Sequence, residues 1–229
     1  MEGTASIGAT HRPLREKVVD ELRRRIIDGA YEPGDRLTEE RLADAFGVSR
    51  NPVREAIRVL TAEGFLLAQP RRGAVVATMS VQDVEDLFDV RLSLEALAAA
   101  LAAARAGPSG AAVLDKLLAK ARTTRRTAEL AALNTQFHAA ICTLSGNALL
   151  VGLMESLHGR VRWVYRQSAE TRAASSWAEH EELAAAIRTG DADAAARAAR
   201  AHVLAAQASA LALAAARHPG PTLPDRHTA

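Results

Sequence analysis

The sequence predicts a mainly α protein of two unlike parts: an N-terminal unit of short helices with a small β-hairpin, and a C-terminal all-α bundle of about six helices. The strongest sign is alanine, the best helix former, because 41 of the 51 alanines lie at or after Ala96. Residues that favour strands are scarce in that half. Residues 65–68 and 74–78 are two short β-type runs, and the turn-rich segment 69–73 between them predicts a hairpin.

The overall composition is that of a globular protein. With 229 residues, 48% of them hydrophobic and 24% charged, the chain can form one or two cores. It has no run of about 18 apolar residues, so we expect no membrane span, and residues 1–30 lack the apolar core of a signal peptide. The single cysteine, Cys142, allows no internal disulfide, which is typical of a cytoplasmic protein. The formal net charge of +2 gives by itself no reason to expect a nucleic-acid partner.

The N-terminal unit is expected over residues 13–78, after a flexible tail over residues 1–12. Apolar residues at every fourth position predict its first helix. Thr38 is a suitable N-cap for a short second helix, and a third helix is expected over residues 50–63. The connection between these two helices is only the three residues 47–49 and contains a glycine, which indicates a helix-turn-helix.

The third predicted helix has two different faces. One face carries apolar residues at helical spacing and is expected to be buried. The other carries Arg50, Arg54 and Arg58 at positions i, i+4 and i+8, which form one cationic stripe. The helix opens with Ser49, Arg50 and Asn51, which are hydrogen-bonding residues at the end that would enter a major groove. Arginine suits guanine there because its fork donates two parallel hydrogen bonds to O6 and N7.

The predicted hairpin adds a second basic element, with Arg71 and Arg72 at its tip beside Gly73. A glycine lets the backbone approach DNA without a Cβ in the way. The segment 45–75 holds five arginines against two glutamates, a local charge of +3 that favours binding to phosphates. The alternative is a solvated arginine face. Aromatic residues make up only 3% of the chain and none lies in the stripe, so an RNA or single-strand binder is disfavoured.

A long motif identifies this unit more closely. It consists of Leu37-Thr38-Glu39-Glu40-Arg41-Leu42-Ala43, Phe46-Gly47-Val48-Ser49-Arg50-Asn51-Pro52-Val53-Arg54-Glu55-Ala56, Leu60 and Glu63-Gly64. Residues 13–78 thereby resemble the winged helix-turn-helix of GntR-family bacterial transcription regulators. The resemblance implies operator contacts by Ser49, Arg50, Asn51 and Arg54, and by Gly73 from the wing. Asn51 stands where a threonine is usual, and Glu40 where some relatives carry a DNA-contacting arginine, so we do not expect that last contact.

The second part, residues 79–217, is helical by pattern, and the Pro-rich segment 218–229 is expected to be a disordered tail. Breaks between its helices are expected at residues 107–110, 122–127, 145–147, 170–176 and 189–190.

Three of its histidines and one asparagine form a candidate metal site. Asn134 and His138 lie one turn apart and share a helix face, whereas His180 and His202 lie in the last two helices. Ligands from several helices are a usual way for a bundle to hold a metal. Imidazole suits a divalent ion such as Zn, Ni or Mn, and the spacing does not choose between them. The alternative is that these histidines are ordinary hydrogen-bonded residues.

Residues 80–215 resemble the FCD ligand-binding domain of FadR-like GntR regulators. The matching residues are Arg91, Leu94-Glu95, Leu133-Asn134-Thr135-Gln136-Phe137-His138, Ser145-Gly146-Asn147, His180, Ile187-Arg188-Thr189-Gly190-Asp191, Ala195 and His202. The resemblance implies a divalent metal held by Asn134, His138, His180 and His202, with the asparagine in place of an aspartate and therefore weaker binding. It also implies a small carboxylate effector bound to the metal. Arg91 and Arg162 are the cations we expect to bind it, the alternative being that they are solvent-exposed helix residues.

Together these features predict a homodimeric bacterial transcription regulator on palindromic double-stranded operator DNA, because one recognition helix reads only a half-site. Repression released by the effector is the commoner behaviour of the family. A regulator whose histidine cluster is structural or metal-free is the first alternative. A metal-dependent hydrolase or dioxygenase is the second, but the sequence has no H-E-x-x-H motif and no acidic residue beside His138 in the chain.

Overall fold

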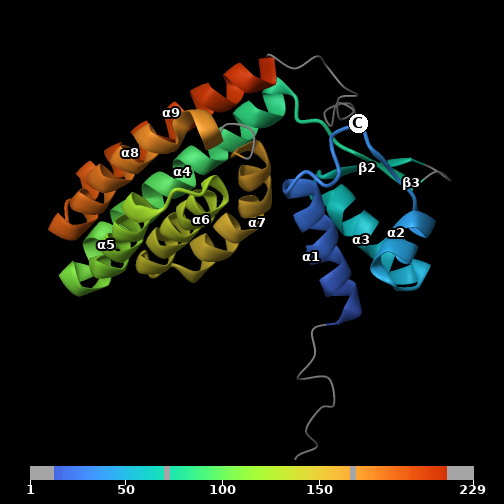
Figure 1. Ribbon diagram of the computed structural model, residues 1–229. Coiled ribbons are helices and arrows are strands. Elements are labelled where there is room, and N and C mark those ends of the chain that lie inside the picture. The colour runs from blue at the N-terminus through green and yellow to red at the C-terminus, as the bar shows by residue number, and fades with distance from the viewer. Residues whose placement is uncertain (1–12, 70–72, 166–168, 216–229) are drawn as a thin grey trace, which may run out of the picture. The chain divides into compact units, whose positions relative to one another are not determined.

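The computed structural model describes residues 13–69, 73–165 and 169–215 (Figure 1). The chain divides between Thr78 and Met79 into two compact units. The two predicted tails and the hairpin tip with Arg71 and Arg72 lie outside the described residues. The described residues are mainly helical with one small sheet in the first unit, so the predicted fold class is confirmed.

The first unit is a helix-turn-helix followed by a wing. Its elements are α1 (Leu14–Ile27), β1 (Arg36–Leu37), α2 (Glu39–Phe46), α3 (Arg50–Ala62), β2 (Leu66–Gln69) and β3 (Gly73–Val76). The hydroxyl of Thr38 accepts a hydrogen bond from the backbone N–H of Arg41 and so caps α2 at the expected residue. Gly47 ends α2 in the left-handed conformation, with φ of 64°, which glycine adopts without a steric penalty.

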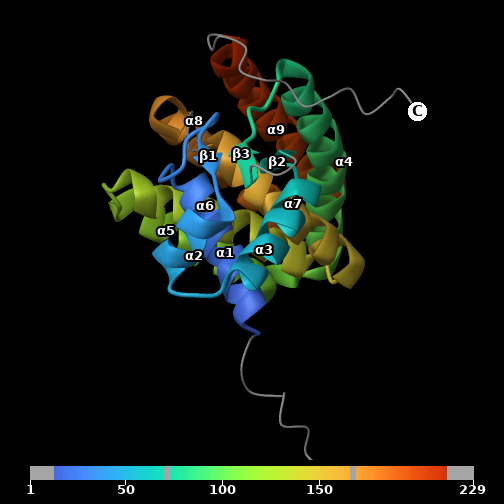
Figure 2. The ribbon, with the colours of Figure 1, turned by 90° about the vertical axis from the view of Figure 1, so that its right-hand side faces the viewer.

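The wing is larger than the sequence predicts. Strand β1, which has only two residues, pairs antiparallel with β3 through Arg36 opposite Val75 and Leu37 opposite Ala74. The sheet therefore has three strands among the described residues, in the order β1-β3-β2, and Figure 2 shows β3 between the other two. A two-residue strand carries no alternation of apolar and polar residues, so the pattern in the sequence could not reveal it.

The core of the first unit lies between α1, α3 and the sheet. The apolar face predicted for the third helix is fully buried, and Leu22 and Ile26 of α1 are buried beside it. Leu14 continues the same spacing but is 54% exposed, because α1 begins there and its first turn extends past the core. This packing holds α3 from behind and leaves its arginine face outward.

Gly73 begins β3 where this strand lies against β1. Its φ is +86°, and a Cβ built there would clash with the carbonyl oxygen of Leu37. The neighbouring strand thus requires a glycine at this position, whether or not DNA approaches it. The predicted DNA contact of Gly73 stays a prediction.

We expect Gly73→Ala to destabilise the first unit by about 2–5 kcal/mol, because a left-handed alanine costs about 1–2 kcal/mol and a backbone clash about 1–3 kcal/mol. Gly34→Ala is the matched control: its φ is +92°, but a Cβ there meets no atom within 4 Å. This control should lose only about 1–2 kcal/mol from the strained φ. Urea unfolding and hydrogen exchange of the sheet amides measure both, and an equal loss in the two variants would contradict the close contact with Leu37.

The second unit is a bundle of six helices among its described residues. They are α4 (Val81–Arg105), α5 (Gly107–Thr123), α6 (Thr127–Leu144), α7 (Ala148–Tyr165), α8 (Ala169–Thr189) and α9 (Ala192–Ala215). The predicted break at 170–176 is wrong, because α8 runs through it. That segment is polar but contains no glycine or proline, and its alanines favour the helix. The segment 107–110 forms the first turn of α5, with a proline near its start.

Helix α4 is the centre of this bundle. It packs along α9 and also contacts α6, α7 and α8 (Figure 1). Its capping box is complete, since Ser80 and Asp83 bond to each other's backbone N–H. Helix α9 is long and apolar enough to cross a membrane by length and composition alone. It also packs against α4 and α8 and buries Ala199, His202 and Val203 inside the bundle.

Candidate functional site

The first candidate surface is the outward face of α3. Ser49, Asn51 and the three arginines of the predicted stripe are all exposed, and the side chains of Arg50, Arg54 and Arg58 are 60%, 50% and 69% accessible. Ser49 is the N-cap residue, but its side chain makes no capping hydrogen bond. The structure therefore exposes all five of these predicted DNA-contacting side chains, three of them along one face of α3 and the other two at its N-terminal end.

Each of these arginines is paired with a glutamate. Arg54 binds Glu39 through two hydrogen bonds of 2.8 and 2.7 Å, and Arg50 binds Glu40 at 2.6 Å. Arg58 binds Glu55 within α3 at 2.8 Å. The local charge of +3 over residues 45–75 omits Glu39 and Glu40, because both come from α2. The stripe is therefore less cationic than the count along the chain indicates.

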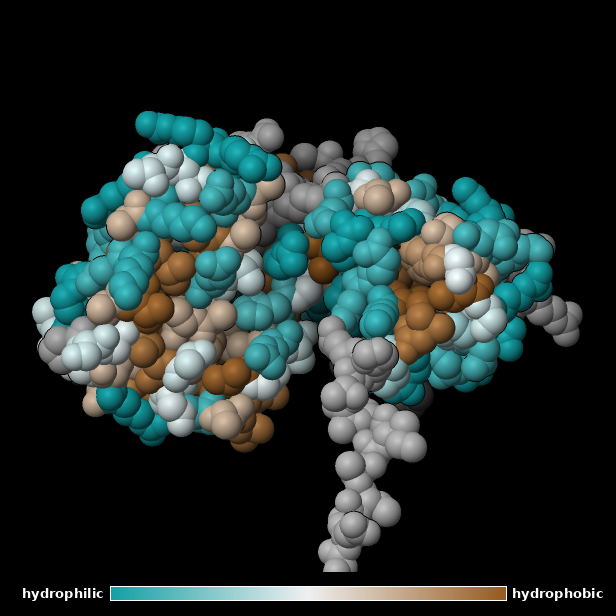
Figure 3. Space-filling model, turned by 60° about the horizontal axis from the view of Figure 1, so that its bottom comes forward, coloured by the Kyte–Doolittle hydropathy of each residue, from teal (hydrophilic) through white to brown (hydrophobic). Residues whose placement is uncertain are grey.

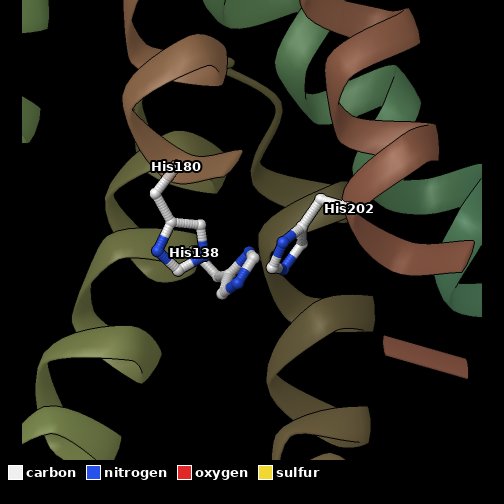
Figure 4. Close-up of side chains that lie close together, drawn as sticks. All are labelled: His138, His180 and His202. Carbon is white, nitrogen blue, oxygen red and sulfur yellow. The ribbon is translucent and has the colours of Figure 1, made fainter. Parts of the chain in front are cut away.

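The second candidate site lies inside the helical bundle. His138 from α6, His180 from α8 and His202 from α9 each offer one nitrogen, and these three atoms lie within 4.8 Å of one another. Their ring centroids are 4.6–5.1 Å apart, and Figure 4 shows the three rings converging. All three side chains are buried. The tertiary structure thus brings together three of the four predicted metal ligands.

Two carboxylates hold the outer sides of this cluster. Nδ1 of His138 lies 3.0 Å from Oε2 of Glu95, and Nδ1 of His202 lies 2.7 Å from Oε2 of Glu179. Since ionised carboxylates only accept, these contacts require a proton on Nδ1 of each imidazole, which leaves Nε2 as the nitrogen that can offer a lone pair to a metal. This arrangement of carboxylate and histidine is the usual support of a metal-binding imidazole.

Four ring nitrogens of the cluster have no hydrogen-bond partner among the described residues. They are Nε2 of His138, Nε2 of His202 and both ring nitrogens of His180, all of them buried. Buried polar atoms are nearly always paired, and each ring brings one nitrogen within 4.8 Å of the other two, so the cluster needs a partner of another kind. A divalent cation accepts lone pairs from imidazoles in this arrangement, and the residues present therefore fit a metal.

The electrostatics keep the cluster in the form that binds metal. Burial lowers the pKa of His180 well below its ordinary value and that of His202 to about 4, with a smaller contribution from His138. These two imidazoles are therefore neutral near pH 7. Burial disfavours the ionised form of Glu95, but Arg91 and His138 outweigh it and hold its pKa well below the usual range.

The remaining predicted residues are placed differently. Arg91 is buried, and its Nε donates to Oε1 of Glu95 at 2.5 Å, so the alternative of an exposed arginine is wrong for this residue. Arg162 is exposed on α7. Asn134 is half-buried one turn before His138. Effector binding by the two arginines and metal binding by the asparagine stay predictions.

Glu95, Glu179 and His158 also belong to this site, although they were not among the predicted residues. The chain has no acidic residue next to His138 in the sequence, but α4 brings Glu95 beside it from 43 residues away. In the sequence, Glu95 follows Arg91 by one helical turn, and this spacing is a signal for an ion pair between them. Nε2 of His158, on α7, is also buried and has no partner in the described part of the chain. Burial lowers the pKa of His158, and repulsion from a protonated His138 would lower it further.

Comparison with known families assigns both units. Residues 14–76 match the family of bacterial regulatory proteins called gntR, and residues 86–205 match the FCD domain. The HTH-type transcriptional regulator YdhC of Bacillus subtilis is 29% identical over 199 residues, which are 84% of this chain and 87% of that protein. The Nta operon transcriptional regulator of Aminobacter aminovorans is 36% identical over 143 residues, covering 60% of this chain and 68% of the relative.

Solved structures agree with this assignment. A GntR transcriptional regulator from Rhodococcus sp. RHA1 superposes with a TM-score of 0.72 at 26% identity, covering 86% of this chain and 97% of that one. The metal-free FCD domain of the regulator TM0439 shares the fold of the helical unit, with a TM-score of 0.54 at 18% identity over 62% of this chain and all of the domain. These families and relatives are regulators and not enzymes. The chain belongs to the GntR family of bacterial transcription regulators and joins a DNA-binding winged helix-turn-helix to an FCD domain.

Proposed function

We propose that the affinity of this regulator for its operator is controlled by a small organic acid, bound at a divalent metal that His138, His180 and His202 hold. The observation that carries the proposal is the convergence of one nitrogen from each of three buried imidazoles that have ring nitrogens without partners among the described residues, with carboxylates on Nδ1 of two of the rings. The metal would be Zn, Ni, Mn or a similar ion, since imidazole is a good ligand for each.

The residues around the cluster have separate tasks in this proposal. Glu95 and Glu179 fix the tautomer and the orientation of His138 and His202. Asn134 supplies an amide oxygen as a fourth, neutral ligand from the preceding turn of α6. A metal in this set of ligands provides an open, positively charged position for a carboxylate. Arg91, behind Glu95, and Arg162, on α7, add positive charge for the acid.

The first unit would read the operator. In this proposal α3 enters a major groove with Ser49, Arg50, Asn51, Arg54 and Arg58, while Arg71, Arg72 and Gly73 of the wing contact the backbone or the minor groove.

Two copies would bind a palindrome as a homodimer in the cytoplasm of a bacterium. Val90 and Leu97, two turns apart on α4, are about half exposed and suit a contact between copies. Figure 3 shows apolar patches between polar ones on the helical unit.

Relatives of this chain include an activator and a repressor: the Glc operon transcriptional activator of Escherichia coli and the Gluconate operon transcriptional repressor of Bacillus licheniformis. For this chain we propose repression that the effector releases. Operator and effector then favour different states of the dimer, so each weakens binding of the other by the same factor.

A structural role for the histidine cluster is the second candidate. His180 stacks on Phe137 with the ring centroids 4.4 Å apart and meets the edge of Trp177 at 4.8 Å, so it also packs as a core aromatic residue. In that case the effector would be bound by side chains alone.

The two candidates differ in their need for metal. Fluorescence anisotropy of the full chain on a duplex from upstream of its own gene would be measured with a panel of small carboxylates, after chelation and after adding back Zn²⁺, Ni²⁺ or Mn²⁺. We expect a carboxylate to change the affinity only when the metal is present. The same change after chelation would support the structural role and overturn the metal-mediated one.

Replacing Arg50 or Arg54 by alanine should weaken binding to that duplex by about 1–3 kcal/mol if the arginine makes a bidentate contact with a base. Arg122→Ala is the control, because Arg122 is equally exposed and ion-paired, with Glu181, but lies in the helical unit. It should leave the affinity unchanged. Wild-type affinity in both α3 variants would contradict the assignment of the recognition helix.

A further inference from the structure

The pair formed by Glu39 and Arg54 differs from the other ion pairs of α3 in its geometry. Oε1 of Glu39 accepts from Nε of Arg54 at 2.8 Å, and Oε2 accepts from Nη2 at 2.7 Å. Two parallel hydrogen bonds fix the plane of a guanidinium as well as its position. The neighbouring pair of Glu40 and Arg50 has one contact of 2.6 Å, and both of its side chains are at least 60% exposed.

The carboxylate of Glu39 is itself held in place by the fold. Glu39 is the first residue of α2, directly after the N-cap Thr38 and two residues after Leu37, which pairs with Ala74 in the sheet. Its side chain is 29% accessible, against 68% for Glu40. The hydrogen bonds from Arg54 lower its pKa, so it stays charged at neutral pH. A fixed backbone and a half-buried side chain make Glu39 a rigid support.

Glu39 occupies only one edge of the guanidinium. An arginine has five N–H groups arranged in a fork. Glu39 takes Nε–H and one hydrogen of Nη2, so Nη1 and the second hydrogen of Nη2 remain. Arg54 makes no other hydrogen bond with the part of the chain that the structure describes. The edge that remains is the end-on edge, which can donate two hydrogen bonds to O6 and N7 of guanine.

We propose that Glu39 is a positioning residue for sequence reading: it orients Arg54 so that the end-on edge of its guanidinium is presented to one guanine of the operator. This inference rests on α3 as the DNA-reading helix. Glu40 has no such role and only lowers the positive charge near Arg50. Glu39 therefore sets which base pair is preferred at one position of each half-site, although it does not itself contact the base.

The test compares base discrimination and not affinity alone. The full wild-type chain first selects duplexes from a randomised library, and the consensus duplex and its single-base-pair substitutions are then used as probes. Glu39→Asp keeps the charge but shortens the side chain by one methylene, so the two parallel bonds to Arg54 cannot both form. We expect it to reduce discrimination at one G·C pair by about five- to tenfold, at the position where Arg54→Ala reduces it most.

Glu40→Asp is the matched control, since it makes the same change at the next residue and should alter discrimination less than about twofold. Thermal unfolding confirms that each variant is folded. Unchanged discrimination by Glu39→Asp, with a loss in Arg54→Ala, would overturn the positioning role and leave the DNA-reading helix in place. Unchanged discrimination in both Glu39→Asp and Arg54→Ala would instead overturn the assignment of Arg54 to the operator. An equal loss over all base pairs in Glu39→Asp would also overturn the positioning role.

Discussion

His180→Ala should abolish stoichiometric binding of a divalent metal to the helical unit. His180 is fully buried, and within the described residues both of its ring nitrogens lack a hydrogen-bond partner, so either can be a ligand. Losing even an outer partner of a ligand costs about 10–100-fold in metal affinity, and losing a ligand of a three-histidine site should cost more than about 100-fold. Metal analysis of the purified protein and titration with Zn²⁺ or Ni²⁺ measure the loss.

His180→Phe separates this loss from a loss of packing. Phenylalanine keeps an aromatic ring between Phe137 and Trp177 but has no nitrogen. We expect this variant to fold, to bind no metal, and to lose the rise in Tm that metal gives the wild-type chain. Bound metal at one ion per chain in His180→Phe would show that the histidine cluster is not the metal site.

Glu95→Ala should destabilise the helical unit by about 3–5 kcal/mol, because it removes one member of the buried ion pair that Glu95 forms with Arg91. The change also removes the acceptor of the Nδ1–H of His138, so metal affinity should fall by about 10–100-fold. Urea unfolding of the metal-free protein, followed by the fluorescence of the two tryptophans, measures the first effect. Titration with metal measures the second.

Asp115→Ala is the control for the loss of an ion pair as such. Asp115 pairs with Arg188 at the surface of the same unit, where the side chains are 48% and 44% accessible. An exposed pair contributes about 0–1 kcal/mol, so this variant should be nearly as stable as the wild type and should bind metal normally. If Glu95→Ala cost no more than Asp115→Ala, the buried triad of Arg91, Glu95 and His138 would have no special weight in the fold.

The DNA-reading unit was predicted closely because its signals are local. The N-cap Thr38, the left-handed Gly47 and the four-residue spacing of the arginines act within one or two helical turns, and each is visible in the chain. The two-residue strand β1 and the pairing of Glu39 with Arg54 depend on contacts between elements. A count of charge along the chain therefore showed a basic stripe and missed the acidic residues that α2 places against it.

The helical unit shows the same division. The alanine content predicted its helices, and the spacing of Asn134 and His138 predicted a shared face, because an α-helix repeats every 3.6 residues. The histidines of the last two helices suggested His180 and His202 as further ligands, and the resemblance to the FCD domain supported them, but no spacing could show that one nitrogen of each ring lies within 4.8 Å of the other two. Glu95 and Glu179 were missed as their partners for the same reason.

From the amino-acid sequence alone, the division into two units, the positions of most helices and the family of both units could be assigned. The tertiary structure decided which charged and polar groups face one another: a carboxylate on each of two imidazoles, and a glutamate on each arginine of α3. The physical reason is the separation along the chain over which each effect acts. Helix propensity, capping and periodicity act between neighbours in the chain, whereas burial and ion pairing depend on atoms that only the packed fold brings together.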